Sequence, residues 1–190
     1  MVATILSAQC TDERVNQVTS KLFRDHPDPA SILALSQEEL EAYIRSCGLY
    51  RNKARNILAA SRRLDELYEG RIPDDRDALM SLPGVGRKTA NVVLANVHDK
   101  AAIAVDTHVF RVSRRLGLAR GETPRQVEEE LMATIPQAEW AATHHRLIAH
   151  GRAICRARRP LCDECPLTRW CDWYAVNVAV RSVASPPARS

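Results

Sequence analysis

The chain of 190 residues is long enough for one large domain or two small ones, each with a proper core. Apolar residues make up 45% of it without any long apolar run, and Met1–Thr4 lacks a basic signal region, so we expect a soluble protein with no membrane span and no secretory signal. A net charge of +4 is too mild to demonstrate a nucleic-acid partner, although a pI of 8.8 is compatible with one.

Helical patterns fill the first part of the chain. Residues 12–25 carry apolar side chains on one face, with Asp12 placed to cap the helix. Ser36–Glu39 has the pattern of a capping box, which begins a second long helix, and residues 53–68 predict a third. No segment of real length alternates with period two, so the sequence predicts an all-α fold.

The segment Leu82–Ala90 reads Leu-Pro-Gly-Val-Gly-Arg-Lys-Thr-Ala and joins two predicted helices, over residues 73–80 and 90–97. Its glycines permit positive φ and a close approach of the backbone to a ligand. The amides from Gly84 to Arg87 would lie at the positive end of the second helix, where a phosphate could bind. Such a pattern alone is most often only a turn, so both interpretations remain open.

Lys88 lies in the first turn of the second helix, and it is one of only four lysines among 27 basic residues. A lysine amine can act as a nucleophile, whereas a guanidinium cannot lose its proton. The helix N-terminus and the neighbouring Arg87 disfavour the ammonium form and so favour a reactive neutral amine. The alternative is a phosphate-binding or solvated lysine.

After the hairpin, an apolar run over residues 101–105 leads to Asp106 and a further apolar helix. Asp106 is therefore expected to be the N-cap of that helix. Thr123–Gln126 is another capping box, and residues 138–153 predict one more helix. Residues 185–190 have the composition of a loose tail.

Six cysteines without a secretory signal indicate a reducing compartment, where metal or cluster ligation outranks disulfides. Zinc ribbons usually pair two short Cys-x2-Cys knuckles, whereas the end of this chain has one such knuckle with wider gaps on both sides. A 4Fe–4S cubane accepts uneven spacing, so both groups remain open on spacing alone. The expected ligands are Cys155, Cys162, Cys165 and Cys171.

Two smaller features concern the other cysteines and the loop inside the first metal pair. Cys10 and Cys47 lie on helical faces and are expected to be small buried hydrophobes. The loop between the first two ligands carries Arg156, Arg158 and Arg159. We call these three the arginine prong; it is either a cationic DNA contact or a solvated surface loop.

The order of these motifs resembles the endonuclease III family, the helix-hairpin-helix DNA glycosylases with a 4Fe–4S cluster. The resemblance rests on the hairpin, on Val-Asp-Thr-His-Val with its aspartate eighteen residues after Lys88, and on the cysteine spacing. It extends to residues 6–9 and 48–50, and so covers nearly the whole chain to Cys171.

The resemblance implies two all-α lobes with the active site in a cleft between them. Residues 1–100 would form a six-helix barrel lobe with the hairpin, and residues 101–190 would form the iron–sulfur cluster lobe. The family's N-terminal helix has no counterpart here, and Met1–Ala8 starts abruptly in an apolar pattern without a cap. We therefore expect that sequence upstream is missing.

The resemblance also implies the roles of individual residues. Lys88 would be the nucleophile that forms a Schiff base, and Asp106 the catalytic carboxylate. Gln9 and Leu49 would fill the gap left by an extruded base and wedge the opposite strand. The DNA contacts would further include Gly84, Val85, Gly86, Arg156, Arg158 and Arg159, and a 4Fe–4S cluster would be the cofactor.

These roles imply a bifunctional DNA glycosylase and AP lyase that excises oxidised pyrimidines from damaged duplex DNA. The expected protein is a monomer without membrane association in a bacterial cytoplasm, near the nucleoid. One alternative is a monofunctional mismatch or adenine glycosylase of the same superfamily, which lacks a lysine at the position of Lys88. Another is a non-catalytic, metal-stapled DNA-binding module, which would not need both Lys88 and Asp106.

Overall fold

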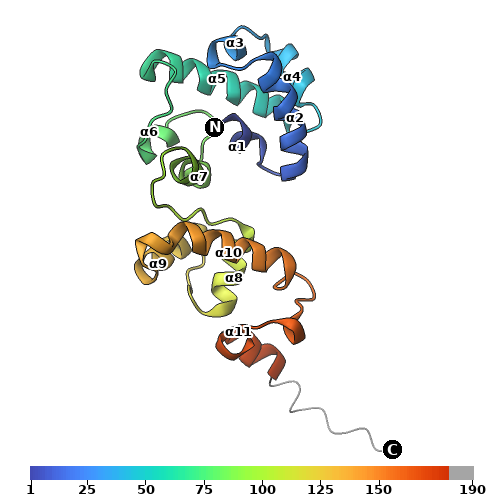
Figure 1. The fold of residues 1–190 in the computed structure, drawn as a ribbon, viewed down its shortest axis with the longest axis vertical. Coiled ribbons are helices and arrows are strands. Elements are labelled where there is room, and N and C mark those ends of the chain that lie inside the picture. Colours follow the sequence, from blue (N-terminus) through green and yellow to red (C-terminus); the bar gives the residue numbers. More distant parts are fainter. Residues whose placement is uncertain (180–190) are drawn as a thin grey trace, which may run out of the picture. The chain divides into compact units, whose positions relative to one another are not determined.

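The computed structural model of the chain describes residues 1–179, and all the regular elements of this part are helices. The prediction of an all-α fold is confirmed. The chain divides into two compact units, residues 1–100 and residues 101–190, which we call unit 1 and unit 2 (Figure 1). Within the described residues, no helix has both the length and the apolar character that crossing a membrane would need.

Unit 1 is built around its longest helix, α5, with α3 and α4 packed along it. The short first helix, α1, contacts α2, α5 and α7, and so lies in the middle of the unit (Figure 1). The helices of unit 1 are α1 (Val2–Leu6), α2 (Asp12–Asp25), α3 (Pro29–Leu33), α4 (Gln37–Ile44), α5 (Tyr50–Tyr68), α6 (Arg76–Met80) and α7 (Arg87–Val97).

The caps of unit 1 explain where its helices begin. The predicted capping box at Ser36–Glu39 is confirmed, with both reciprocal hydrogen bonds present. The prediction that Asp12 caps α2 is wrong, because the side chain of Thr11 accepts the hydrogen bond and Asp12 is the first helical residue. Asp75 caps α6 in the same way, so this helix begins later than the predicted residue 73.

Unit 2 has α8 packed against α9 and α10, with several single turns after them. The predicted helix over residues 138–153 is divided into a turn of 3-10 helix and α10. The elements are α8 (Thr107–Leu116), α9 (Pro124–Thr134), η1 (Gln137–Glu139), α10 (Trp140–Ala153), η2 (Cys162–Glu164), η3 (Thr168–Trp170), α11 (Asp172–Tyr174) and the π-helical η4 (Ala175–Ala179). The predicted tail over residues 185–190 lies outside the described residues.

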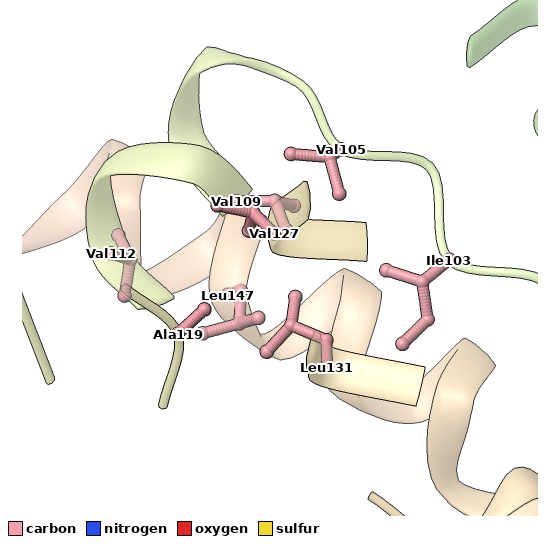
Figure 2. Packing of buried hydrophobic residues seen from close by; sticks show 8 residues of the cluster. All are labelled: Ile103, Val105, Val109, Val112, Ala119, Val127, Leu131 and Leu147. Carbon is pink, nitrogen blue, oxygen red and sulfur yellow. The ribbon is translucent and has the colours of Figure 1, made fainter. Parts of the chain in front are cut away.

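One aliphatic core holds unit 2 together (Figure 2). Its side chains come from the segment before α8, from the three long helices and from the turn after α8. The residues are Ile103, Val105, Val109, Val112, Ala119, Val127, Leu131 and Leu147. Gly151 lets α10 approach α8, since a Cβ there would lie 3.0 Å from the Cβ of His108.

Candidate functional site

The hairpin joins α6 to α7 and has the backbone conformation that its glycines suggest. Gly84 has a φ of 77°, in the left-handed region, and the side chain of Val85 is buried beneath the turn. The amide of Val85 donates to the carbonyl oxygen of Leu82 at 3.1 Å and is therefore used inside the hairpin. In the described part of the chain, the amides of Gly84 and Gly86 have no such partner, so these two remain available to an outside acceptor.

Gly84→Ala should destabilise the protein by about 2 kcal/mol, since a non-glycine residue in the left-handed region costs about 1–2 kcal/mol and a steric clash adds to it. The new Cβ would lie 2.8 Å from the Cβ of Asn56 on α5. Gly86→Ala is the matched control, because a Cβ there meets no atom within 4 Å and its φ is −87°. Gly86→Ala should lower the free energy of unfolding by less than about 1 kcal/mol. Chemical denaturation of both variants checks the difference, and equal midpoints would contradict it.

Lys88 is the second residue of α7, directly after a helix start that no side chain caps. Its side chain is exposed. Among the described residues, none forms a hydrogen bond or an ion pair with its amine. The amine is therefore free to meet a ligand from solution, while the uncapped first turn beside it favours an anion.

Asp106 is the N-cap of α8, as the sequence predicts. Its Oδ1 accepts from the amides of His108 at 2.8 Å and Val109 at 2.7 Å. Its Oδ2 has no bonding partner in the part of the chain that the structure describes. The flanking Val105 and Val109 belong to the core of unit 2, which fixes the carboxylate in place (Figure 2). One oxygen of the Asp106 carboxylate thus caps α8, and the other is available to act on a substrate.

Gln9 and Leu49 both lie in the left-handed region, with φ of 53° and 57°, which is uncommon for residues other than glycine. Both side chains are exposed, and Leu49 keeps 59% of its surface accessible. Their segments touch, because a Cβ on Gly48 would lie 3.4 Å from the carbonyl oxygen of Gln9. Two residues with a strained backbone and an exposed side chain therefore belong to neighbouring segments of unit 1.

The buried Lys53 connects the two segments that carry Gln9 and Leu49. Its Nζ donates to the carbonyl oxygen of Leu6 at 2.8 Å, which ties α5 to the end of α1. The segment after α1 leads to Gln9, and the start of α5 follows Leu49.

Cys47 is buried as expected, whereas Cys10 is only half-buried. Burial raises the pKa of the Cys47 thiol to about 11, so it remains a protonated, apolar group.

The last four cysteines of the chain all line one cavity. Its empty volume is about 340 Å³, a figure that includes the part of the cavity open to solvent. No three His, Cys, Asp or Glu side chains of the described residues gather closely enough to hold a single metal ion. A cubane binds each thiolate at a different corner iron, so sulfurs spread around a cavity suit it. The cavity is lined by Cys155, Cys162, Cys165 and Cys171, together with Arg115 and Leu116 of α8, His150 of α10, and Trp173 and Tyr174 of α11.

The electrostatics of this cavity oppose free thiolates. Burial raises the pKa of the Cys162 thiol, and the three neighbouring cysteines raise it further. Thiolates become stable there only beside positive charge, which an iron cluster supplies. The donor set, the cavity and the raised pKa therefore fit a cluster.

Hydrogen bonds from the helices surround the sulfurs, and the sequence did not reveal them. Arg115 donates to the Sγ of Cys155 at 3.4 Å, and the Nε2 of His150 lies 3.7 Å from the Sγ of Cys165. Arg111 donates to the carbonyl oxygens of Cys155 and Gly151, at 3.1 and 2.9 Å. The two arginines are four residues apart on α8, a spacing that could equally have marked a solvated helix face.

The three arginines of the prong are exposed, and Arg159 has a φ of 54°. The side chain of Arg156 folds back to the carbonyl oxygen of Ala153 at 3.2 Å. The prong thus presents positive charge to solvent from the loop between Cys155 and Cys162.

Comparison with known proteins identifies both parts of the chain. Residues 2–137 match the model of the HhH-GPD superfamily base excision DNA repair protein. Residues 155–171, with the four cysteines, match the iron-sulfur binding domain of endonuclease III. The second match decides the question that spacing left open, because the matched domain binds an iron–sulfur cluster rather than zinc, in agreement with the expected 4Fe–4S cofactor.

Individual relatives agree with these matches. The chain is 53% identical to endonuclease III of Bacillus subtilis (strain 168) over 172 residues, which are 90% of this chain and 78% of that protein. It superposes with a TM-score of 0.87 and 53% identity on a trapped covalent intermediate of endonuclease III with DNA, over 90% of this chain and 81% of the other. A non-covalent endonuclease III–DNA complex gives a TM-score of 0.88 at 50% identity, over 97% and 84% of the two chains. On these grounds the chain belongs to the endonuclease III family of base excision DNA repair proteins.

Proposed function

We propose that this protein excises oxidised pyrimidines from duplex DNA through a Schiff base on Lys88, and then cuts the strand by β-elimination. The broader activity follows from its family: it is a DNA glycosylase and AP lyase of base excision repair. The observation that carries the finer proposal is the exposed amine of Lys88, which has no partner among the described residues and lies at the uncapped start of α7.

The reaction begins when the damaged base leaves the stack, at a cost of a few kcal/mol that a weakened pair reduces. The neutral amine of Lys88 forms a bond to C1′ of the sugar, and the bond from C1′ to the base breaks. The carboxylate of Asp106 assists proton transfer or stabilises positive charge on the sugar, through the oxygen that does not cap α8.

The C1′–O4′ bond then breaks and O4′ takes up a proton, which opens the sugar ring and leaves a Schiff base between the Lys88 nitrogen and C1′. This Schiff base acidifies the hydrogen on C2′. Loss of this proton forms a double bond and expels the 3′ phosphate oxygen, so the strand is cut on the 3′ side. One amine thus serves both the glycosylase and the lyase step. A monofunctional relative would stop after base removal.

We further propose that unit 1 is the six-helix barrel lobe and unit 2 the iron–sulfur cluster lobe. Cys155, Cys162, Cys165 and Cys171 would hold the cluster, which would support the prong structurally. The prong would contact the DNA backbone, and the amides of the hairpin at Gly84 and Gly86 would hold a phosphate. Val85, predicted as a third DNA contact, would instead support the turn with its buried side chain, since its amide donates to Leu82. The protein would work as a monomer in a bacterial cytoplasm, near the nucleoid.

Leu49→Ala should weaken binding to a lesion duplex several-fold, because Leu49 would wedge the DNA while contributing little to the core. Leu67→Ala is the matched control, since Leu67 lies on α5 in the same unit with 57% of its surface exposed, against 59% for Leu49. Both variants should keep their stability within about 0.5 kcal/mol. Fluorescence anisotropy with a labelled duplex measures the binding, and equal losses in the two variants would count against the wedge.

The proposed function is tested by the product formed on a duplex with one ring-saturated pyrimidine. We expect a strand cut on the 3′ side of the lesion: the 5′ fragment ends in an unsaturated sugar aldehyde, and the other fragment begins with a 5′ phosphate. An intact strand with an abasic site would instead indicate the monofunctional alternative. Binding without any base release would indicate a non-catalytic module.

A further inference from the structure

Arg115 lies near the end of α8 and bonds to the first cysteine and the loop that follows it. Its Nη1 donates to the Sγ of Cys155 at 3.4 Å and to the carbonyl oxygen of Arg156 at 2.8 Å. Its Nη2 donates to the carbonyl oxygen of Ala157 at 3.1 Å. One guanidinium therefore spans a sulfur and two carbonyls at the base of the arginine prong.

Two further contacts fix the position of Arg115. The guanidinium carbon lies over the Trp173 ring, 4.7 Å from its centre, so the ring packs against it. The backbone oxygen of Arg115 lies 3.3 Å from the Sγ of Cys171, which donates to it as a thiol and would lose this hydrogen bond on binding the cluster as a thiolate. The residue thus contacts the first and the last of the four cysteines with different atoms.

A hydrogen bond from a cation to a thiolate draws negative charge away from the sulfur. In iron–sulfur sites such bonds stabilise the more negatively charged, reduced form and therefore raise the reduction potential. An arginine is suited to this because it stays charged at any working pH. We infer that Arg115 is a positioning residue that raises the reduction potential of the cluster through Cys155 and also fixes the base of the prong.

This inference rests on the proposed ligation of the cluster by Cys155. The two neighbouring arginines of α8 make other contacts, so we assign the bond to the cysteine sulfur, and its effect on the potential, to Arg115 alone. Arg111 donates to the carbonyl oxygen of Cys155 rather than to its sulfur. The guanidinium of Arg114 lies over the ring of Phe110, 5.3 Å from its centre, away from the thiols. Arg114→Met therefore removes the same charge from the next position without removing the bond to sulfur.

The test uses the cluster-loaded full chain in three forms: Arg115→Met, Arg115→Lys and the control Arg114→Met. We expect the midpoint potential to shift downward in Arg115→Met, to shift less in Arg115→Lys, and to stay near the unchanged protein in Arg114→Met. Loss of visible absorbance to an iron chelator should be roughly tenfold faster or more in Arg115→Met, as for other residues that support a metal ligand. Trypsin should also cut the prong faster in Arg115→Met alone.

The outcomes separate this inference from the function on which it rests. Equal potentials and equal rates of cluster loss in Arg115→Met and Arg114→Met would overturn it, even with the cluster fully loaded. If Arg115→Met does not take up the cluster, the potentials and the rates of cluster loss are compared between Arg115→Lys and Arg114→Met instead. Equal values in these two variants would then overturn the inference. Cys155→Ser is measured alongside, and an unaltered spectrum and potential in that variant would show instead that the proposed ligand set is wrong.

Discussion

Lys88→Gln should abolish covalent trapping and strand cleavage while leaving the binding of duplex DNA in place. An amide nitrogen cannot attack C1′ or form a Schiff base, so the rate should fall on the order of 10⁴-fold or more, as for other lost nucleophiles. The fold should be unaffected within about 0.5 kcal/mol, since Lys88 is exposed. Single-turnover kinetics on a lesion duplex, with borohydride present or absent, measure both steps.

Lys21→Gln is the control for this experiment, because it removes another exposed lysine amine from unit 1. Lys21 lies over the ring of Tyr43 on the outer side of α2, at 5.4 Å from its centre. Its loss should leave trapping and cleavage as they are. Undiminished trapping in Lys88→Gln would reject Lys88 as the nucleophile.

Asp106→Asn should lower base excision by about 10²–10⁴-fold, the range expected for the loss of a positioned acid–base group. Asparagine caps a helix about as well as aspartate, so α8 should remain capped through the oxygen that accepts from His108 and Val109. The variant removes the charge and keeps the structure, and its thermal midpoint should therefore hardly change.

Asp106→Ala separates the two roles of this carboxylate. It removes the cap together with the charge and should cost about 1 kcal/mol of stability beyond the catalytic loss. Thermal unfolding and turnover of the two variants are compared side by side. If Asp106→Asn excises bases at the normal rate while Asp106→Ala is destabilised, capping is the only role of Asp106.

Features that depend on near neighbours in the chain could be predicted from the sequence. The capping boxes at Ser36–Glu39 and Thr123–Gln126 form because side chain and amide are three residues apart, and both are present. The hairpin at Leu82–Ala90 is equally local, since Gly84 adopts the positive φ that its turn requires. The N-cap at Asp106 belongs to the same class.

Features that depend on packing between distant segments could not be predicted. The bond from Arg115 to Cys155 joins residues 40 positions apart and requires α8 to pack on α10. The contact of Gln9 with Gly48 likewise arises only when α1 lies against α5. A positive φ at Leu49 goes against the preference of its residue type, so it is imposed by the surrounding fold.

The most direct test of the central claim is the chemical identity of the covalent adduct. The unchanged, cluster-loaded protein is incubated with a duplex that carries one ring-saturated pyrimidine, reduced with borohydride and digested. Mass spectrometry of the peptides then locates the sugar remnant. A remnant on the side-chain nitrogen of Lys88 is the result we predict; a remnant on another lysine or on the N-terminal amine, or no adduct despite strand cleavage, would contradict the mechanism.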